Sequence, residues 1–338
     1  MTSTTSTTVF VSGANGFIAQ HIVKQLLQQG YSVVGSVRSA DKGEYLKQLT
    51  NSTKFSYEIV KDIGGIGAFD EPLKKHPEVT VFIHTASPVT FVADDVERDI
   101  IQPAIAGTKN ALEAIHKYAP QITRVVITSS LGAVFGFEKY FEPEKVYDED
   151  SWNPIDYQTS LLNPRNGYYG SKKFAELAAV EFVKSVKPKF DISFVNPSFV
   201  FGPQAYEVKD KSQLNLSAEV VNKVLKLKST DEIPVFAGRF VDVRDVARAH
   251  IVAFTSQDTI NQRLLMIESL ASNEEIAYYI NRHFPEINIP RGDLTKGLEQ
   301  LKGSHKYDNS KTRKILGFDF ISLEDSVVAS VQQVLDTE

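Results

Sequence analysis

Short apolar runs alternate with longer amphipathic stretches through the first part of the chain. The runs with strand character cover residues 9–11, 32–37, 55–60, 81–84, 124–128 and 191–196. The stretches with helical spacing cover residues 17–29, 100–118 and 168–186. Because the strands are rich in β-branched residues and alternate with helices, the pattern predicts an α/β fold whose parallel sheet is covered on both faces.

Beyond residue 196 this pattern loosens. Proline-bearing loops surround helices that we expect around residues 218–227 and 244–255. We therefore predict a first domain over residues 1–196, of which 1–7 form a loose polar tail, and a smaller C-terminal lobe over 197–338 that binds the substrate. Some segments of this lobe are expected to return to the first domain.

The first strand runs directly into a glycine-containing turn, Ser12-Gly13-Ala14-Asn15-Gly16-Phe17-Ile18-Ala19. Gly13 permits a tight turn, Gly16 lets phosphates approach the backbone, and the small Ala19 lets the next helix lie close to the sheet. The spacing departs from the usual Gly-x-Gly-x-x-Gly pattern, so an ordinary turn is the alternative. Its place between a strand and a helix, with a second strand following, favours a doubly wound Rossmann domain for a dinucleotide. The predicted contacts in this turn are Gly13, Asn15, Gly16, Phe17 and Ile18.

The end of the second strand indicates which dinucleotide is bound. Arg38 stands where an NAD-selective site usually has an acidic residue for the ribose hydroxyl. A guanidinium suits a 2′-phosphate, to which Lys42 could add charge and Ser39 a hydroxyl. We therefore predict NADPH/NADP as the cofactor; the alternative is that Arg38 is a solvated loop residue.

Composition and charge exclude several classes of protein. The 338 residues carry a net charge of −5, which gives no basic field for nucleic acid. The absence of cysteine excludes disulfides and thiolate chemistry, and the seven histidines lack metal-binding spacing, so we expect no metal. No apolar run reaches membrane-spanning length, and the polar stretch at residues 2–8 has no targeting features. We expect a cytoplasmic protein with a small-molecule substrate and no nucleic-acid or membrane partner.

Tyr-x-x-x-Lys is the candidate for the catalytic chemistry, because an ammonium on the same helix face can support a tyrosine that exchanges protons. The chain has four such pairs, Tyr57/Lys61, Tyr168/Lys172, Tyr169/Lys173 and Tyr307/Lys311. The first lies in a predicted strand, where its members are too far apart to cooperate. The last is expected on a surface helix ending near Gly317. The two central pairs are left as rivals.

Several motifs in the same order along the chain resemble the extended short-chain dehydrogenases/reductases. They are the glycine turn, Arg38, Thr128-Ser129-Ser130, Tyr168-x-x-Ser171-Lys172 and Asn196-Pro197-Ser198. More narrowly, the chain resembles the fungal methylglyoxal and 3-methylbutanal reductases, relatives of plant dihydroflavonol reductases. The segments that carry this resemblance are His84-Thr85-Ala86-Ser87-Pro88, Tyr168 to Glu176, Val200-Phe201-Gly202-Pro203 and Asp242-Val243-Arg244-Asp245-Val246-Ala247.

The resemblance implies Ser130, Tyr168 and Lys172 as the catalytic triad of an NADPH-dependent carbonyl reductase. It favours Tyr168 over Tyr169, because Ser171 stands directly before Lys172 as in the family. Ser130 would bind the carbonyl oxygen, Tyr168 would protonate it, and Lys172 would stabilise the phenolate and bind the nicotinamide ribose. Ser129 is the alternative serine. The structural alternatives are a serine pair that caps a loop and a tyrosine that fills the core.

Further contacts are expected where the other strands end, since open α/β sheets bind their ligands at that edge. The additional cofactor candidates are Asp62, Ile63, Thr85, Ala86, Ser87, Pro197 and Ser198. His84 is expected to be structural, and Asn110 to pack its helix rather than order a water molecule. The apolar side chains that could wall the substrate pocket, or equally lie in the core, are Phe91, Val92, Leu131, Phe135, Tyr169, Phe199 and Phe201.

Two other functions fit the same scaffold. One is a different enzyme, such as a nucleotide-sugar epimerase or a hydroxysteroid dehydrogenase, and the other is a noncatalytic NADP sensor. A sensor has no need of a proton donor. A nucleotide-sugar enzyme needs basic groups for the diphosphate, and the C-terminal lobe offers mainly Arg239 and Arg244. The sequence therefore favours reduction of neutral carbonyl compounds: methylglyoxal, branched aliphatic aldehydes, aromatic ketones or diketones.

Overall fold

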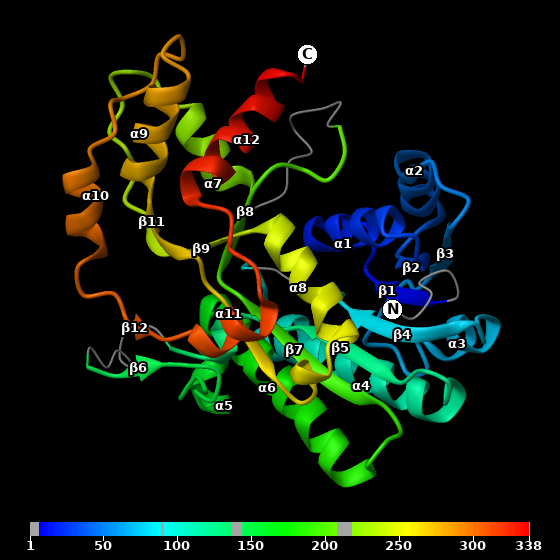
Figure 1. Ribbon diagram of the computed structural model, residues 1–338. Coiled ribbons are helices and arrows are strands. Elements are labelled where there is room, and N and C mark those ends of the chain that lie inside the picture. Colours follow the sequence, from blue (N-terminus) through cyan, green and yellow to red (C-terminus); the bar gives the residue numbers. More distant parts are fainter. Residues whose placement is uncertain (1–6, 89–90, 137–143, 208–217, 338) are drawn as a thin grey trace.

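A central parallel sheet organises the protein. The computed structural model describes residues 7–88, 91–136, 144–207 and 218–337. The sheet has seven strands in the order β10-β7-β5-β4-β1-β2-β3 (Figure 1). Their bounds are β1 Thr8–Ser12, β2 Ser32–Val37, β3 Phe55–Ile59, β4 Val79–His84, β5 Arg124–Thr128, β7 Asp191–Pro197 and β10 Arg263–Met266. Each neighbouring pair is parallel.

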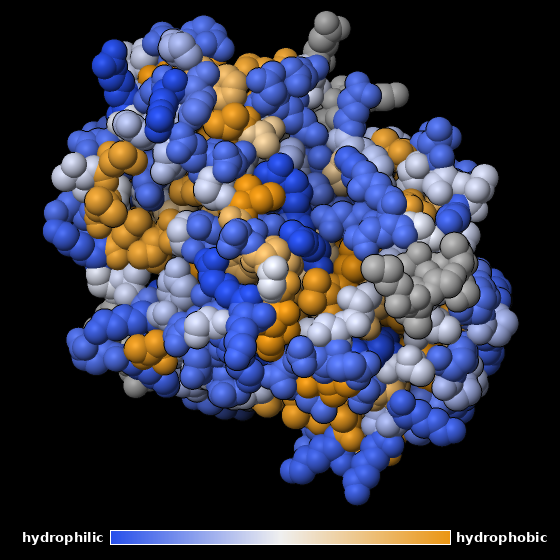
Figure 2. Space-filling view, viewed as in Figure 1, coloured by the Kyte–Doolittle hydropathy of each residue, from blue (hydrophilic) through white to orange (hydrophobic). Residues whose placement is uncertain are grey.

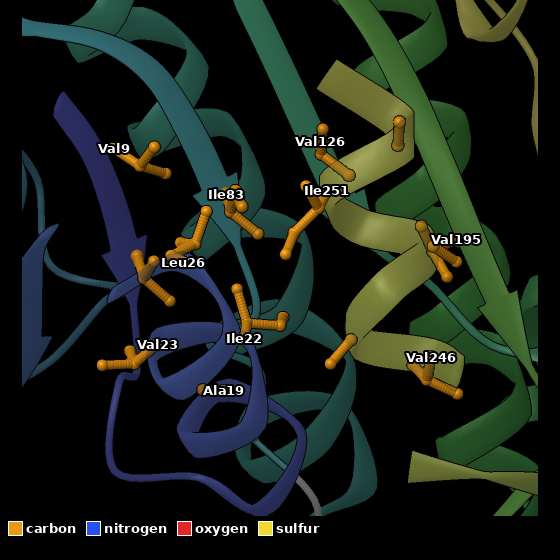
Figure 3. Packing of buried hydrophobic residues seen from close by; sticks show 14 of the residues in the cluster. Val9, Ala19, Ile22, Val23, Leu26, Ile83, Val126, Val195, Val246 and Ile251 are labelled. Carbon is orange, nitrogen blue, oxygen red and sulfur yellow. The ribbon is translucent and has the colours of Figure 1, made fainter. Parts of the chain in front are cut away.

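Helices cover both faces of this sheet, which confirms the doubly wound α/β fold. Along β1, Val9 and Val11 belong to one hydrophobic cluster and Phe10 to the other, as expected for side chains that alternate across a strand. On the first face lie α1, Phe17–Gln28, and α8, Val243–Thr255, whose apolar residues pack against side chains of the strands (Figure 3). The second cluster includes residues of α4, Gln102–Tyr118, α6, Pro164–Val186, and α3, Asp70–Lys75.

The strand order reverses beside β1, because β2 and β3 continue on one side and β4 on the other. The turn after β1 therefore lies where two connections leave in opposite directions, which is the usual ligand site of such sheets. Helix α2, Ala40–Thr50, links β2 to β3. A five-residue π-helical turn, Glu97–Ile101, precedes α4.

Residues after β7 build a smaller group of elements, seen at the upper left of Figure 1. A three-stranded sheet has the order β11-β9-β8. Its strands are Ser269–Ser272, Ala237–Asp242 and Phe199–Phe201, and the helices that share its core are α7 Ala218–Leu225, α9 Asn273–His283 and α12 Leu323–Leu335. Helix α10, Leu294–Leu301, lies against β11 and α9. The same half of the chain also sends α8 and β10 to the large sheet; the domain boundary at residue 196 stays a prediction.

Three short elements complete the fold. Strand β6, Val146–Tyr147, pairs with β12, Lys306–Tyr307, and α5 covers Tyr157–Ser160. Helix α11 spans Ser310–Leu316 and ends at Gly317. The expectation that Tyr307 and Lys311 share a surface helix was wrong, because Tyr307 belongs to β12 and only Lys311 to α11. No helix of the described residues is long and apolar enough to cross a membrane, and the face in Figure 2 is largely hydrophilic with separate apolar patches.

Candidate active site

The turn after β1 leads directly into α1, whose first backbone amides lack helical acceptors. Gly13 has a φ of +64°, and a Cβ at this position would lie 3.1 Å from the Cα of Ala86. The Gly13 amide donates to Ser36 Oγ at 3.1 Å, which ties the turn to β2. Helix α1 starts after Gly16 without a side-chain cap and with no acidic residue in its first turn. These features fit a dinucleotide pyrophosphate, because the first-turn amides of α1 and the helix dipole favour an anion.

The remaining predicted residues of this turn take different places. Phe17 and Ile18 form the first turn of α1, so their amides belong to the set that lacks helical acceptors. The carbonyl oxygen of Asn15 accepts a hydrogen bond from Gln20 Nε2 at 2.9 Å, which fixes the turn against the helix. Ala19 is buried and packs against the sheet, as its small size predicted (Figure 3).

Arg38 lies immediately after β2 and is exposed. Among the described residues, no carboxylate forms an ion pair with it. Ser39 is the N-cap residue of α2, yet its side chain makes no capping hydrogen bond, and Lys42 is exposed in the first turn of this helix. Two cations and a hydroxyl are thus available at the edge of the sheet, which fits a 2′-phosphate.

A hydrogen-bond cluster fixes the end of β4 against the glycine turn. Ser12 Oγ accepts from the amides of Thr85 and Ala86, each at 3.1 Å, and it lies 2.9 Å from His84 Nδ1. The two accepted bonds leave the hydroxyl proton of Ser12 available, so Ser12 donates a hydrogen bond to His84 Nδ1. Burial and the charge of Lys172 lower the pKa of His84 to about 4. His84 is therefore a neutral structural residue, as expected, and Ser87 is half-buried just beyond it.

The loop after β3 is anchored by α4. Asn110 Nδ2 donates to the carbonyl oxygens of Ile63 and Gly65, each at 2.8 Å, so this side chain packs its helix against the loop as predicted. Asp62 Oδ1 accepts from the Gly64 amide at 2.8 Å. Asp62 and Gly64 also line an open depression of about 440 Å³.

The structure brings the three predicted catalytic side chains together. Ser130 follows β5 and caps a short 3₁₀ helix, Leu131–Ala133, where its Oγ accepts from the Gly132 amide at 3.0 Å. The hydroxyl oxygens of Ser130 and Tyr168 are 3.3 Å apart. Lys172 lies one turn further along α6, with its Nζ 5.7 Å from the centre of the Tyr168 ring. The helix begins at Pro164 behind an Asn163 cap, earlier than expected.

The same geometry separates the rival assignments. Ser129 Oγ donates to the carboxylate of Glu176, so the proton of this hydroxyl is already bound within the protein. Lys173 Nζ donates to the carbonyl oxygen of Ile155 at 2.7 Å. Of the two serines, only Ser130 is hydrogen-bonded to Tyr168, and of the two lysines, only Lys172 has its ammonium near that ring.

Burial shifts both titrating groups of this cluster. It raises the pKa of Tyr168, and the hydrogen bond with Ser130 acts in the opposite direction. It lowers the pKa of Lys172 to about 8, because the charged ammonium is removed from water. The Tyr168 phenol is thus protonated at neutral pH, which is the form that can donate a proton.

The end of β7 carries the last two predicted cofactor contacts, Pro197 and Ser198. Pro197 is buried, and the Ser198 amide donates to the carbonyl oxygen of Met266 at 3.1 Å. The Ser198 Oγ is also buried but has no hydrogen-bond partner among the described residues. An unsatisfied buried hydroxyl at the ligand edge of the sheet fits a polar group of a bound molecule.

The predicted pocket residues lie in different surroundings, and two of them contact Tyr168. The Phe91 ring lies 5.3 Å from the Tyr168 ring and is 52% exposed, and the Tyr169 ring meets Tyr168 edge-on at 5.6 Å. Phe199 is 46% exposed and contacts Phe236. Of the others, Val92 is largely exposed. Leu131 and Phe135 are buried in one cluster with Tyr147. Phe201 is fully buried in the core of the C-terminal lobe.

Glu176 is a site residue that sequence reasoning missed. It lies eight residues after Tyr168, and its buried carboxylate accepts hydrogen bonds from Ser129, Asn196 and Arg263. The available signal was spacing, because Tyr168, Lys172 and Glu176 recur every four residues on one helix face. Nothing along the chain pointed to Arg263 as its partner.

The fold and this cluster define a dinucleotide-dependent enzyme of the short-chain dehydrogenase type. The chain belongs to the NAD dependent epimerase/dehydratase family, whose sequence profile matches residues 9–266. A relative from Candida albicans is 51% identical over 337 residues, which cover 98% of this chain and 99% of the relative. The NADPH-dependent methylglyoxal reductase GRE2 of Saccharomyces cerevisiae is 43% identical over 337 residues, with 98% of each chain covered.

Solved structures agree with this assignment. The crystal structure of Gre2 from Candida albicans in complex with NADPH has a TM-score of 0.94 at 47% identity and covers 98% of this chain and 99% of its own. That of yeast methylglyoxal/isovaleraldehyde reductase Gre2 complexed with NADPH has a TM-score of 0.92 at 43% identity and covers 97% and 98%. The resemblance to the extended short-chain reductases is therefore confirmed.

Proposed function

We propose that this protein is an NADPH-dependent carbonyl reductase that converts aldehydes and ketones to alcohols. The observation that carries the proposal is the pair of hydroxyl groups of Ser130 and Tyr168, 3.3 Å apart beside the buried Lys172. Two hydroxyls at this separation can both reach one carbonyl oxygen. The yeast relative that is named as an NADPH-dependent methylglyoxal reductase supports the same activity.

The residues around the glycine turn would hold the cofactor. The turn and the start of α1 would bind the pyrophosphate, Arg38, Ser39 and Lys42 the 2′-phosphate, and Asp62 and Ile63 the adenine. Thr85, Ala86 and Ser87 would line the middle of the cofactor, and Pro197 and Ser198 the nicotinamide. NADPH supplies a hydride for the carbonyl carbon when it is bound.

The protein's own residues supply the proton chemistry. The Gly132 amide occupies one lone pair of Ser130 Oγ, which leaves the Ser130 proton free for the substrate oxygen. Tyr168 donates its proton to that oxygen as negative charge develops there. Lys172 lies close enough to stabilise the phenolate that is left.

The surroundings of Tyr168 favour apolar, neutral substrates. Phe91 and Tyr169 place two rings against it, and a ring wall suits an alkyl or aryl group next to the carbonyl. We propose methylglyoxal, 3-methylbutanal-like aldehydes and aromatic ketones as the substrate class. The crystal structure of the yeast methylglyoxal/isovaleraldehyde reductase supports the first two.

We also propose the cytoplasm as the compartment of this protein, because the sequence has no cysteine that an oxidising compartment would pair.

A nucleotide-sugar epimerase fits less well. Arg239 is buried, donates to the carbonyl oxygen of His305 and lies over the Phe135 ring. Arg244 forms a two-point hydrogen bond with Asp242 at 2.8 Å. Both arginines are therefore bound within the protein instead of facing a substrate diphosphate. The intact Ser130, Tyr168 and Lys172 likewise disfavour a noncatalytic sensor.

NADPH oxidation against a panel of carbonyl compounds tests the proposal. The panel consists of methylglyoxal, 3-methylbutanal and an aromatic ketone, with a UDP-sugar as control. We expect turnover with at least one carbonyl compound and none with the sugar. Turnover with the sugar alone would overturn the proposal in favour of the epimerase, and cofactor binding without any turnover would favour the sensor.

The pH dependence of the reaction follows from the two shifted groups. Tyr168 keeps its proton because its pKa is raised, whereas Lys172 loses its charge as the pH rises through about 8. We expect kcat/KM for the carbonyl substrate to decline above that pH, since this ratio reports groups of the enzyme before substrate binds. A Lys172→Arg variant, whose side chain stays charged, should lack this decline. A wild-type profile that stays level through that pH would contradict the role of the Lys172 charge.

A further inference from the structure

Glu176 connects four elements of the large domain through one carboxylate. Its side chain is 1% exposed. Oε2 accepts from Ser129 Oγ at the end of β5 and from Asn196 Nδ2 in β7 at 2.9 Å. Oε1 accepts from Arg263 Nε in β10 at 2.5 Å. This carboxylate of α6 is thus bonded to residues of β7 and β10 and to the residue that follows β5.

Two of these three donors are next to residues of the candidate site. Ser129 directly precedes Ser130, and Asn196 directly precedes Pro197. Asn196 Nδ2 also donates to the carbonyl oxygen of Ser130 at 3.3 Å, so it holds the backbone of the serine that bonds to Tyr168. Glu176 shares the helix face of Tyr168 and Lys172. The carboxylate therefore joins the helix that carries the phenol to the loop that carries the serine.

The arrangement requires a charged acceptor. A carboxylate accepts hydrogen bonds at both oxygens, whereas a glutamine has one acceptor and one donor group. Every neighbour of Glu176 in this network is a donor, so an amide of the same shape would turn its NH₂ group toward at least one of them. The Arg263 guanidinium is fixed in turn by the carbonyl oxygen of Glu149 at 2.9 Å and by the Trp152 ring at 4.1 Å, so it does not simply move away.

We propose that Glu176 is a positioning residue for carbonyl reduction. Through Ser129 and Asn196 it holds the Ser130 hydroxyl where it reaches the same substrate oxygen as the Tyr168 hydroxyl. This inference rests on the proposed function. Both hydroxyls must reach one substrate oxygen, and a displacement of about 1 Å at a reacting group can cost about a hundredfold in rate. The hydrogen bonds of Glu176 run to Ser129, Asn196 and Arg263 and not to Tyr168 or Lys172, so its effect passes through the serine loop.

The test is a Glu176→Gln variant measured by steady-state kinetics and by NADPH titration. We expect kcat, normalised to the sites that bind NADPH, to fall at least tenfold, while the NADPH dissociation constant changes less than twofold. The kinetic isotope effect with deuterated NADPH should increase, because misplaced hydroxyls make the chemical step slower. Loss of stability alone would lower the number of binding sites and leave the normalised kcat and the isotope effect unchanged. The matched control is Glu181→Gln, an exposed residue on the same helix, which should behave as wild type.

A Ser129→Ala variant provides a second test that does not disturb the buried ion pair. It removes one of the three donors, so we expect a several-fold lower normalised kcat and unchanged NADPH binding, and this variant decides the matter if Glu176→Gln does not fold. Wild-type values of normalised kcat in Ser129→Ala, or in a folded Glu176→Gln, would overturn the inference. A wild-type chain that binds NADPH but reduces no carbonyl compound would instead overturn the proposed function, and this inference with it.

Discussion

Replacement of Tyr168 by phenylalanine is expected to lower kcat for carbonyl reduction by about 10² to 10⁴-fold, the usual contribution of a general acid. The change removes the hydroxyl that lies 3.3 Å from Ser130 Oγ and keeps the ring. The contacts of this ring with Phe91 and Tyr169 therefore persist, and so does the position of Lys172. The NADPH dissociation constant should stay within about twofold of wild type, because the phenol is only one of the many residues predicted to contact the cofactor.

The measurement pairs aldehyde-dependent NADPH oxidation with a fluorescence titration of NADPH. Tyr278→Phe in α9 is a suitable control, since it removes a hydroxyl from another tyrosine that also contacts a neighbouring tyrosine ring. It should retain wild-type turnover. Full activity in Tyr168→Phe would dismiss this residue as the acid and leave the reaction without an identified proton donor.

Replacement of Arg38 by alanine is expected to reduce the preference for NADPH over NADH by about ten- to a hundredfold. A hydrogen bond to a charged group contributes about 1.5 to 3 kcal/mol, and each 1.4 kcal/mol corresponds to a factor of ten. Arg38 is exposed directly after β2 and has no carboxylate partner among the described residues, so its guanidinium is free to bind a phosphate. The effect should appear in kcat/KM for NADPH and be nearly absent for NADH.

The ratio of kcat/KM for the two cofactors is the quantity to measure. Lys42→Ala should lower it less, because an ammonium makes a single-point contact where a guanidinium can bind with two. Arg291→Ala removes another exposed arginine, in the loop before α10, and should leave the ratio as in wild type. An unchanged ratio in Arg38→Ala would show that the 2′-phosphate is held elsewhere.

Sequence reasoning worked best where local chemistry determines the structure. The apolar run Val9-Phe10-Val11 predicted a strand of a sheet covered on both faces, and Gly13 predicted a tight turn, which has a positive φ in the structure. The alternation of strands and helices likewise predicted a parallel sheet covered on both faces. These features depend on residues close to one another in sequence, so the pattern alone carries them.

The candidate site was harder to predict where distant segments meet. Ser129 and Ser130 are neighbours in the sequence, and only the position of Glu176 on another element shows which hydroxyl is bound elsewhere. The same holds for the aromatic residues near strand ends. Phe91 reaches Tyr168, whereas Phe201 lies in the core of the C-terminal lobe, because β8 continues into a second sheet that spacing does not reveal.

Residues late in the chain, in α8 and β10, belong to the large domain, and this limits where the chain can be cut into fragments. Strand β10 forms the sheet edge beside β7, and α8 covers the apolar side of α1. A fragment cut at residue 196 would expose β7 as an unpaired edge and leave the Glu176 carboxylate buried without its arginine. During synthesis, the catalytic half of the molecule can reach its final form only after residue 266 has left the ribosome.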